Sequence, residues 1–324
     1  MRDAFIDTLM KLARRNSKIF LITADYGFSL LEKFRDEFPG RFLNVGIAEQ
    51  NMIGIAAGLS LSGKCVFTYS QIPFTTLRCL EHIRNDLCYQ KLGVKLVGIG
   101  SGFAYDTLGF THHAIEDIGV MRALPNMIVL SPGDPIEVRR AVESSLKIKL
   151  PVYIRLAKRG EPVINKENMK FEIGKGNVVK DGGDVALFTT GNSLKTAVDV
   201  ARILENKGLS TMVISMHTLK PIDKNLIKKV SEKVNCMFSI EEHNTIGGLG
   251  SAISEVLTEL DHHILFKRFG VDDEYLTPLG KIEYIREKIN LTPRQLSKSI
   301  INISSRKYLK IPYLNNRRQN AFRV

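Results

Sequence analysis

Short apolar runs that alternate with longer helical segments are the feature that most constrains the fold of this 324-residue chain. The run IFLITAD, at residues 19–25, is almost wholly apolar and ends in an acid. A continuous apolar run of this length is typical of a strand buried on both faces of a parallel sheet. Such strands, separated by helices, predict an α/β fold in which ligands bind where the strands end.

The alternation occurs in two series, so we expect two doubly wound α/β domains. In the first series, further apolar runs lie at residues 41–47, 64–69, 94–101 and 126–132, and helices are predicted at 1–18, 48–63, 73–90 and 135–146. In the second series, strands are predicted within 184–191, 209–223 and 236–244, and helices at 193–208, 223–234 and 247–260. The expected organisation is a first domain with a mostly parallel sheet at 1–160, a polar linker at 161–182, a second domain at 183–303 and a basic tail at 304–324.

Cysteine usage and charge narrow the class of protein. The four cysteines are scattered and show neither a CxxC pair nor a metal-ligand spacing, which favours a reducing compartment. No apolar run approaches the roughly 20 residues of a membrane helix, so we expect a cytoplasmic protein without a membrane partner. The net charge of +12 is spread along the chain without a nucleic-acid-binding signature, so no nucleic acid is expected, and a basic field suits phosphorylated sugars.

The segment NVGIAEQNMIGIAAGLS contains the most informative acid, Glu49, at a predicted strand-to-helix turn. A glutamate in the first turn of a helix is ordinary by itself, because it complements the helix dipole. Other segments follow it in a fixed order, namely YSQIPF with LRCLEHIRNDLCYQKLGV, GFTHHAIEDIGVMRALPNMIVLSPGDP, ALFTTGNSLKTAVDVARILENKG, HTLKPID and IEEHNTIGGLGSAISE.

Taken together, these segments resemble the transketolase family over roughly residues 1–290. The resemblance extends to the pyrimidine-binding domains of deoxyxylulose-phosphate synthase and of 2-oxoacid dehydrogenase β chains. It implies that the cofactor is thiamine diphosphate with Mg²⁺. It also implies that a pyrimidine-binding domain precedes a transketolase C-terminal domain. Several long motifs in the right order are more specific than any one of them.

The resemblance assigns cofactor-binding roles to four residues. Glu49 would hydrogen-bond the aminopyrimidine ring and drive the tautomerisation that activates the cofactor. Phe74 would stack on this ring, and Tyr69 competes for that role because the alignment needs a shift of one or two residues. Asp25 matches an acid that follows the family's first strand and lies near the thiamine.

Four further residues match positions at or near the family's substrate site. His112 matches the catalytic histidine of a Thr-His loop, where it would bind sugar oxygens and help to move protons. His113 stands where the family usually has glutamine. Arg155 matches an arginine that clamps the substrate's phosphate. His243 matches a C-terminal-domain histidine whose motif serves packing, the subunit interface and the rim of the active site.

The chain departs from the family at two points. Transketolases carry an aspartate four residues before the loop histidine, but this position is Leu108 and the nearest acid is Asp106. We therefore expect a deoxy or otherwise modified sugar substrate. The chain also lacks the GDG motif, with its more distant asparagine, that holds the diphosphate and Mg²⁺. This departure predicts a partner chain, the N-terminal transketolase subunit, that mainly holds the Mg²⁺, and an α₂β₂ assembly containing a homodimer of this chain.

Three functions remain open from the sequence. The first is two-carbon ketol transfer between sugar phosphates, by an enzyme that is active only with the diphosphate-binding partner. The second is the E1 β-type subunit of a 2-oxoacid dehydrogenase, which is also split between chains. The third is a non-catalytic partner or scaffold. Retention of Glu49 and His112 favours an enzyme over the third function.

Overall fold

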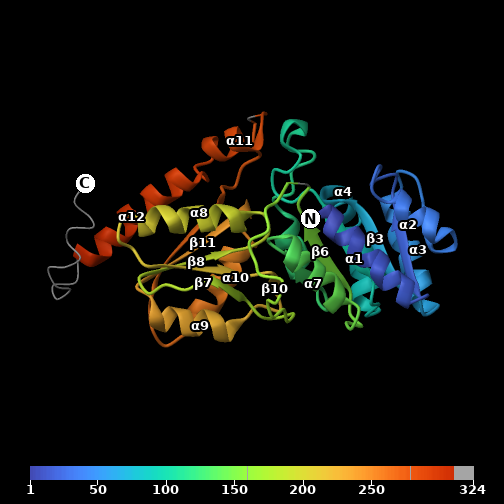
Figure 1. The fold of residues 1–324 in the computed structure, drawn as a ribbon, viewed down its shortest axis with the longest axis horizontal. Coiled ribbons are helices and arrows are strands. Elements are labelled where there is room, and N and C mark those ends of the chain that lie inside the picture. Colours follow the sequence, from blue (N-terminus) through green and yellow to red (C-terminus); the bar gives the residue numbers. More distant parts are fainter. Residues whose placement is uncertain (159, 278, 310–324) are drawn as a thin grey trace.

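The structure is a computed structural model that describes residues 1–158, 160–277 and 279–309. It contains two β-sheets, each flanked by helices (Figure 1). The first domain, blue to green, and the second, yellow to red, lie beside each other along the longest axis. The predicted α/β class with mostly parallel sheets is confirmed. Residues 310–324, most of the expected basic tail, lie outside the described residues.

The first sheet has seven strands in the order β10-β5-β6-β4-β3-β1-β2. Six of them pair in parallel. All of these except the partly exposed edge strand β2 are almost wholly buried, as expected of a sheet covered on both faces. Their bounds are β1 Ile19–Thr23, β2 Phe42–Asn44, β3 Cys65–Gln71, β4 Lys95–Ile99, β5 Ile128–Leu130 and β6 Val152–Leu156.

Helices cover both faces of this sheet. Helices α1 and α7 share one apolar core with the sheet, whereas α3 and α6 pack in the core of the opposite face. The helical bounds are α1 Arg2–Arg15, α2 Glu32–Glu37, α3 Glu49–Leu61, α4 Ile72–Thr76, α5 Leu80–His82, α6 Asp117–Ala123 and α7 Pro135–Ser145, with 3₁₀ turns η1 Pro39–Arg41 and η3 Asp106–Leu108. The helix expected at 73–90 is interrupted, because α4 ends at Thr76 and α5 runs into a π-helix, η2 Ile83–Tyr89.

The second sheet has five strands in the order β12-β11-β8-β9-β7. Part of the expected linker differs from its prediction, since Asn177–Lys180 forms the antiparallel edge strand β7. The remaining bounds are β8 Val185–Thr189, β9 Thr211–Ser215, β11 Cys236–Asn244, β12 Leu265–Val271, α8 Ser193–Glu205, α9 Lys224–Lys233, α10 Leu249–Thr258, α11 Ile282–Lys288 and α12 Pro293–Leu309.

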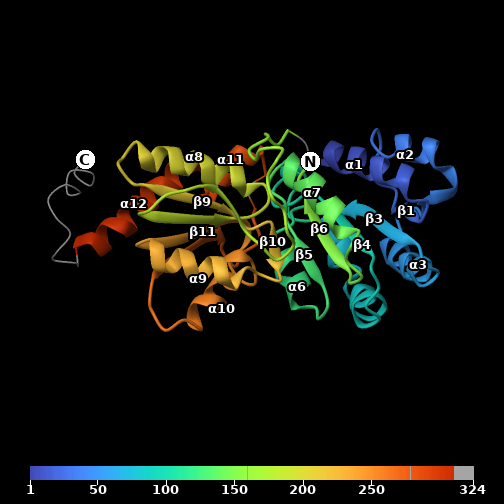
Figure 2. The same cartoon turned by 60° about the horizontal axis from the view of Figure 1, so that its bottom comes forward.

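A short strand from the second half of the chain joins the first sheet. Strand β10 (Thr218–Lys220) pairs antiparallel with β5 at the sheet's edge (Figure 2). The ammonium of Lys220 donates to the carbonyls of Arg122 and Leu124, at 2.8 and 2.5 Å. The two domains therefore share a hydrogen-bonded sheet and are held in a fixed relation, which positions the residues at their junction.

Candidate active site

The loops that follow four neighbouring parallel strands gather at one edge of the first sheet. Asp25 follows β1, Glu49 follows β2, Phe74 follows β3, and His112 lies in the loop after β4. Parallel strands all end at the same edge, and this edge is where α/β sheets bind their ligands. The topology thus brings together residues that are almost 90 positions apart in the sequence.

Glu49 is the first residue of α3, and only 3% of it is exposed. The free N–H groups of a helix N-terminus favour a carboxylate at this position. One of its oxygens, Oε2, accepts a hydrogen bond from Nη1 of Arg78 at 2.6 Å. Glu49 is therefore a buried carboxylate whose charge is balanced by a helix end and by one half-exposed arginine.

Arg78 connects three of the predicted site residues. Its guanidinium carbon lies 4.7 Å from the centre of the Phe74 ring. The Phe74 ring in turn meets the imidazole of His112 edge-on, with ring centres 5.5 Å apart. The structure thus forms a continuous chain of contacts from Glu49 through Arg78 and Phe74 to His112. The sequence interpretation missed Arg78, although its spacing of four residues from Phe74 was a usable signal.

His112 lies in a loop whose neck is closed by two hydrogen bonds between Gly102 and Ala114. Its Nδ1 is 2.9 Å from the hydroxyl of Thr111, which leaves Nε2 for another partner. Burial lowers the pKa of His112 below its ordinary value of 6.5, so the imidazole is neutral at neutral pH. A neutral imidazole can both donate and accept a proton, as the predicted role requires.

His113 points into the loop rather than toward Phe74. Its Nε2 lies 3.1 Å from the carbonyl oxygen of Asp106, and its ring packs edge-on against Phe103 with centres 5.4 Å apart. Burial lowers the pKa of His113. These contacts describe a residue that holds the shape of the loop, which differs from the expected contact with substrate.

Asp25 and Tyr69 lie in different surroundings. Asp25 is exposed, has a left-handed backbone (φ 49°), and exchanges hydrogen bonds with the side chain of Asn44 at 2.9 and 3.3 Å. Tyr69 is fully buried between the rings of Phe5 and Tyr26, and its hydroxyl accepts from Arg2. Because neighbouring rings flank Tyr69, it offers no free face to a pyrimidine, and Phe74 is the better stacking candidate.

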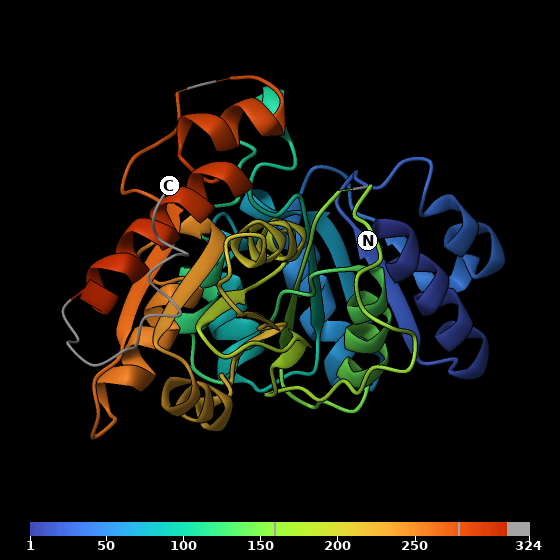
Figure 3. The same cartoon turned by 60° about the vertical axis from the view of Figure 1, so that its left-hand side comes forward.

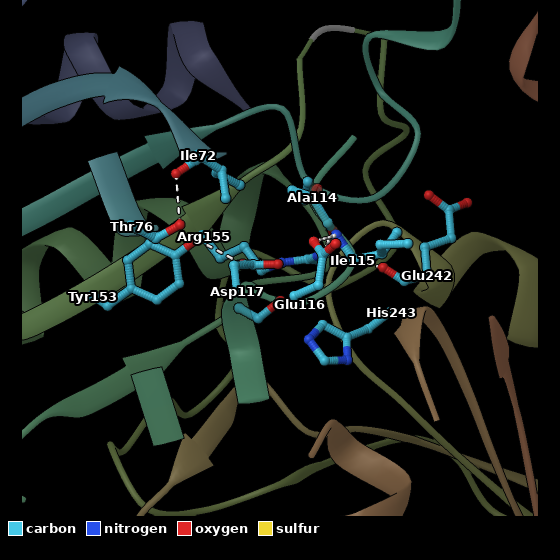
Figure 4. A network of polar contacts seen from close by, with 12 residues as sticks. Ile72, Thr76, Ala114, Ile115, Glu116, Asp117, Tyr153, Arg155, Glu242 and His243 are labelled. Atoms are coloured by element: carbon cyan, nitrogen blue, oxygen red, sulfur yellow. Dashed lines mark hydrogen bonds and ion pairs between the residues drawn. The ribbon is translucent and has the colours of Figure 1, made fainter. Parts of the chain in front are cut away.

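Arg155 lies within a network of polar contacts that includes Asp117, Ala114 and Glu242 (Figure 4). It is 2% exposed, and its Nε donates to Oδ2 of Asp117 at 2.8 Å. Its Nη2 donates to the carbonyls of Ala114 and Glu242, at 2.8 and 3.1 Å. The expectation for Arg155 is corrected here, because its fork is already bound to an acid and to main-chain oxygens from both domains.

His243, from the second domain, packs against α6 of the first. Its Nε2 accepts from the main-chain N–H of Gly119 at 3.2 Å, so Nδ1 carries the proton that is donated to the Asn244 carbonyl at 2.8 Å. Burial lowers the pKa of His243, which keeps it in this neutral form. Its contacts are those of a residue at the junction between the domains.

Some general features of the described part of the chain bear on the site. All four cysteines are free thiols. Among residues 1–158, 160–277 and 279–309, no three His, Cys, Asp or Glu side chains are grouped so that they could hold a metal ion. No helix in these same ranges combines the length and the apolar character needed to cross a bilayer.

Two family models match consecutive parts of the chain. The transketolase pyrimidine-binding domain matches residues 1–161, and the transketolase C-terminal domain matches residues 174–295. The first match contains Glu49, Phe74 and His112, and the second contains His243. The chain belongs to the transketolase family.

Two relatives and one solved structure are described by their names as subunits or assemblies of transketolases. A 6-deoxy-6-sulfo-D-fructose transketolase subunit from Clostridium sp. (strain MSTE9) is 35% identical, over 95% of each chain. One of the subunits of an apulose-4-phosphate transketolase from Phocaeicola vulgatus is 36% identical, over 84% of this chain and 88% of the relative. A solved structure described as a split gene transketolase, inactive beta4 tetramer, aligns with a TM-score of 0.86 and 38% identity, covering 95% of this chain and 98% of the other.

Proposed function

We propose that this chain is the C-terminal subunit of a two-chain transketolase that transfers a two-carbon ketol unit between sugar phosphates. The observation that carries this proposal is the chain of contacts from Glu49 through Arg78 and Phe74 to His112, at the ligand-binding edge of a parallel sheet. Its carboxylate, aromatic ring and neutral imidazole are the groups that activation of a cofactor ring and proton movement at a sugar require.

Thiamine diphosphate is the cofactor that these residues fit. When bound, it supplies the carbanion chemistry that breaks and forms the carbon–carbon bond. Glu49 would hydrogen-bond a ring nitrogen of the aminopyrimidine, because a buried carboxyl can hold or share a proton there. Phe74 would fix the tilt of that ring by stacking. Arg78 would hold the Glu49 carboxylate in place through their 2.6 Å contact.

A partner chain completes the site in this proposal. The sequence contains no GDG motif for the diphosphate, so the N-terminal subunit would hold the diphosphate and most of the Mg²⁺ ligands. The similar solved structure is named as an inactive assembly of β chains, which supports a need for a second subunit. The four free thiols fit a reducing, cytoplasmic location for the assembled enzyme.

Association of this chain with a second copy is supported by the surface of α3. Its outward face carries exposed Asn51, Gly54, Gly58 and Leu61, at the spacing of one helix face. A side-chain carbon added at either glycine would have no neighbour within 4 Å. Small residues on such a face allow another backbone to approach closely, directly beside Glu49 at the start of the same helix. An α₂β₂ assembly would therefore place both active sites next to this contact.

The substrate of this proposal is a sugar phosphate or a related anionic sugar. Leu108, where the family has an aspartate, is 54% exposed on the His112 loop and cannot accept a hydrogen bond from a sugar hydroxyl. A sugar that lacks or replaces that hydroxyl would lose nothing at this position. The names of the two relatives refer to 6-deoxy-6-sulfo-D-fructose and to apulose-4-phosphate, and the first of these supports a modified sugar.

The two alternative functions receive less support. The relatives described above are transketolase subunits, which favours ketol transfer over oxidation of a 2-oxoacid. A scaffold would not need Glu49, Phe74 and His112 to converge on one sheet edge. A panel of 2-oxoacids, assayed beside the sugar phosphates, separates the two enzymatic candidates.

Replacement of Glu49 tests the proposal directly. In the complex reconstituted with the N-terminal subunit, Glu49→Ala is expected to lower kcat by at least about 100-fold, because ring activation loses its carboxyl. The assay measures ketol transfer, and size-exclusion chromatography monitors assembly. Glu37→Ala, which removes an exposed acid of α2 paired with Arg14, is the matched control. Turnover of Glu49→Ala at the rate of the control would contradict the assignment.

A further inference from the structure

The His112 loop is held from outside its own domain. Residues 102–114 form a closed loop, because Gly102 and Ala114 exchange two main-chain hydrogen bonds of 3.0 and 3.1 Å. Gly102 has a φ of 57°, and a side-chain carbon there would lie 2.3 Å from Oε2 of Glu242. The neck of the loop therefore needs glycine, so that a carboxylate of the second domain can approach it.

Glu242 is a buried acid near the end of β11, and it has hydrogen-bond partners in both domains. Its Oε2 accepts from the main-chain N–H of Phe103 at 3.3 Å and from the amide of Asn192 at 2.5 Å. Its Oε1 is bound by both Nε and Nη2 of Arg286, with Nε at 2.6 Å. One carboxylate thus joins the loop neck to α8 and α11 of the second domain.

Apolar contacts support the same loop along its length. Phe103 of the loop and Ile115, which directly follows it, share a small core with second-domain side chains, namely Val271, Leu276 and Ile285. At the loop tip, the rings of Phe110 and Tyr275 lie 5.7 Å apart. Figures 1 and 3 both show the loop after β4 rising beside α11. The loop is therefore packed against the second domain at its neck and at its tip.

We propose that Glu242 is a positioning residue, which sets the place of His112 in the active site by anchoring the neck of its loop to the second domain. This inference rests on the proposed function of His112. Glu242 lies 130 residues after His112 in the sequence, so only the folded structure relates it to the loop. The second domain, on this view, contributes to substrate binding through one buried acid.

The Glu242 carboxylate can anchor the loop because it is negatively charged and binds groups of both domains at once. If Glu242 loses its negative charge, the mostly buried guanidinium of Arg286 no longer has an ion-pair partner. The N–H of Phe103 and the amide of Asn192 would also lose an ionised acceptor, which is the stronger kind. The neck would then open more often, and His112, ten residues further on, would occupy a wider range of positions.

Hydrogen exchange of this chain alone tests the anchoring step. Glu242→Gln is expected to speed amide exchange in residues 102–114 about tenfold, as expected for loss of a charge-assisted hydrogen bond. Glu241→Gln is the matched control, because this neighbouring acid is equally buried but accepts from Leu249 and Gly250 at the start of α10. Arg286→Gln should reproduce the effect of Glu242→Gln, since Arg286 holds the same carboxylate.

Kinetics of the reconstituted complex test the consequence for His112. Glu242→Gln should raise KM for the sugar phosphate and lower kcat/KM, while the affinity for thiamine diphosphate stays as in the Glu241→Gln complex. Equal exchange of the loop in the Glu241 and Glu242 variants would overturn the proposal, and so would a loosened loop with unchanged KM. A wild-type complex without ketol transfer would refute the proposed function instead, and exchange would still decide whether Glu242 anchors the loop.

Discussion

Glu49 lies where burial, a helix N-terminus and an arginine act on a single carboxylate. The N-terminal end of α3 carries this buried carboxylate and the guanidinium of Arg78 contacts it, so its position is fixed from two sides. Burial lowers the pKa of His112, so its neutral imidazole can both give and take a proton near neutral pH.

The pH dependence of turnover tests the role of His112. Because burial lowers its pKa below 6.5, the neutral form persists to lower pH than in an ordinary histidine. We expect kcat/KM of the reconstituted complex to fall only below pH 6.5, as the imidazole takes up a proton. His112→Gln should remove this acid limb and lower turnover about 100-fold. A pH profile whose acid limb survives in His112→Gln would show that another group titrates.

A substitution at Arg155 distinguishes a structural role from a substrate-binding role. Arg155→Gln leaves the Asp117 carboxylate buried without its cation, so the free energy of unfolding should fall by about 3–5 kcal/mol. Denaturant unfolding of the chain measures this change, and Arg155→Lys should recover part of it because the charge is kept. Unchanged stability together with a raised KM for the sugar phosphate would restore the role of phosphate clamp.

At the scale of single elements, α3 combines two functions. Its first residue is the proposed cofactor-activating acid, and its outward face is lined by small residues that nothing in the described structure covers. The helix thus connects assembly to chemistry, since the proposed contact between two copies of the chain begins one turn from Glu49. This arrangement makes α3 the element at which assembly can be changed without altering the core.

Gly54→Leu tests the proposed contact between copies. The isolated chain should keep or slightly gain stability, by up to about 1 kcal/mol, because glycine is a poor helix former and the added side chain meets open space. Self-association, measured by sedimentation, should weaken at least tenfold. Gly183→Leu, at an exposed glycine of the second domain with equally open surroundings, is the control. Equal association of both variants would place the contact elsewhere.

Elements with a strong periodic signal could be predicted from the sequence, and those shaped by tertiary contacts could not. The apolar runs at β1, β4 and β11 were recognised because buried parallel strands need continuous apolar residues. Strands β7 and β10 have four and three residues and depend on partners distant in the sequence. The break between α4 and α5 likewise has no signal in the sequence, because no proline or glycine lies between Thr76 and Leu80.

The same limit applies to the candidate site. Glu49, Phe74 and His112 lie in motifs that could be recognised along the chain, and the structure brings the three into one chain of contacts. Arg78 and Glu242 were not predicted, because their roles depend on which loops meet in space. The prediction for Arg155 differs from the structure, because the sequence does not show whether an arginine at the end of a strand faces solvent or a buried acid such as Asp117.

At the scale of the whole molecule, the two domains act as one support for the site. Strand β10 extends the first sheet with a segment of the second half, and Arg155 and Glu242 bind main-chain atoms across the junction. The first domain supplies the proposed cofactor-activating residues, and the second fixes the loop of His112. The sequence contains no GDG motif for a diphosphate, and the central proposal is that this chain is one half of a shared site.

Calorimetric binding of thiamine diphosphate with Mg²⁺ tests that claim most directly. The titration is made first with this chain alone and then with the chain mixed with its N-terminal partner subunit. We predict saturable binding only in the mixture, because Glu49 and Phe74 can hold the pyrimidine end of the cofactor but not its phosphates. Tight, Mg²⁺-dependent binding to this chain alone would show a complete cofactor site and would contradict the account.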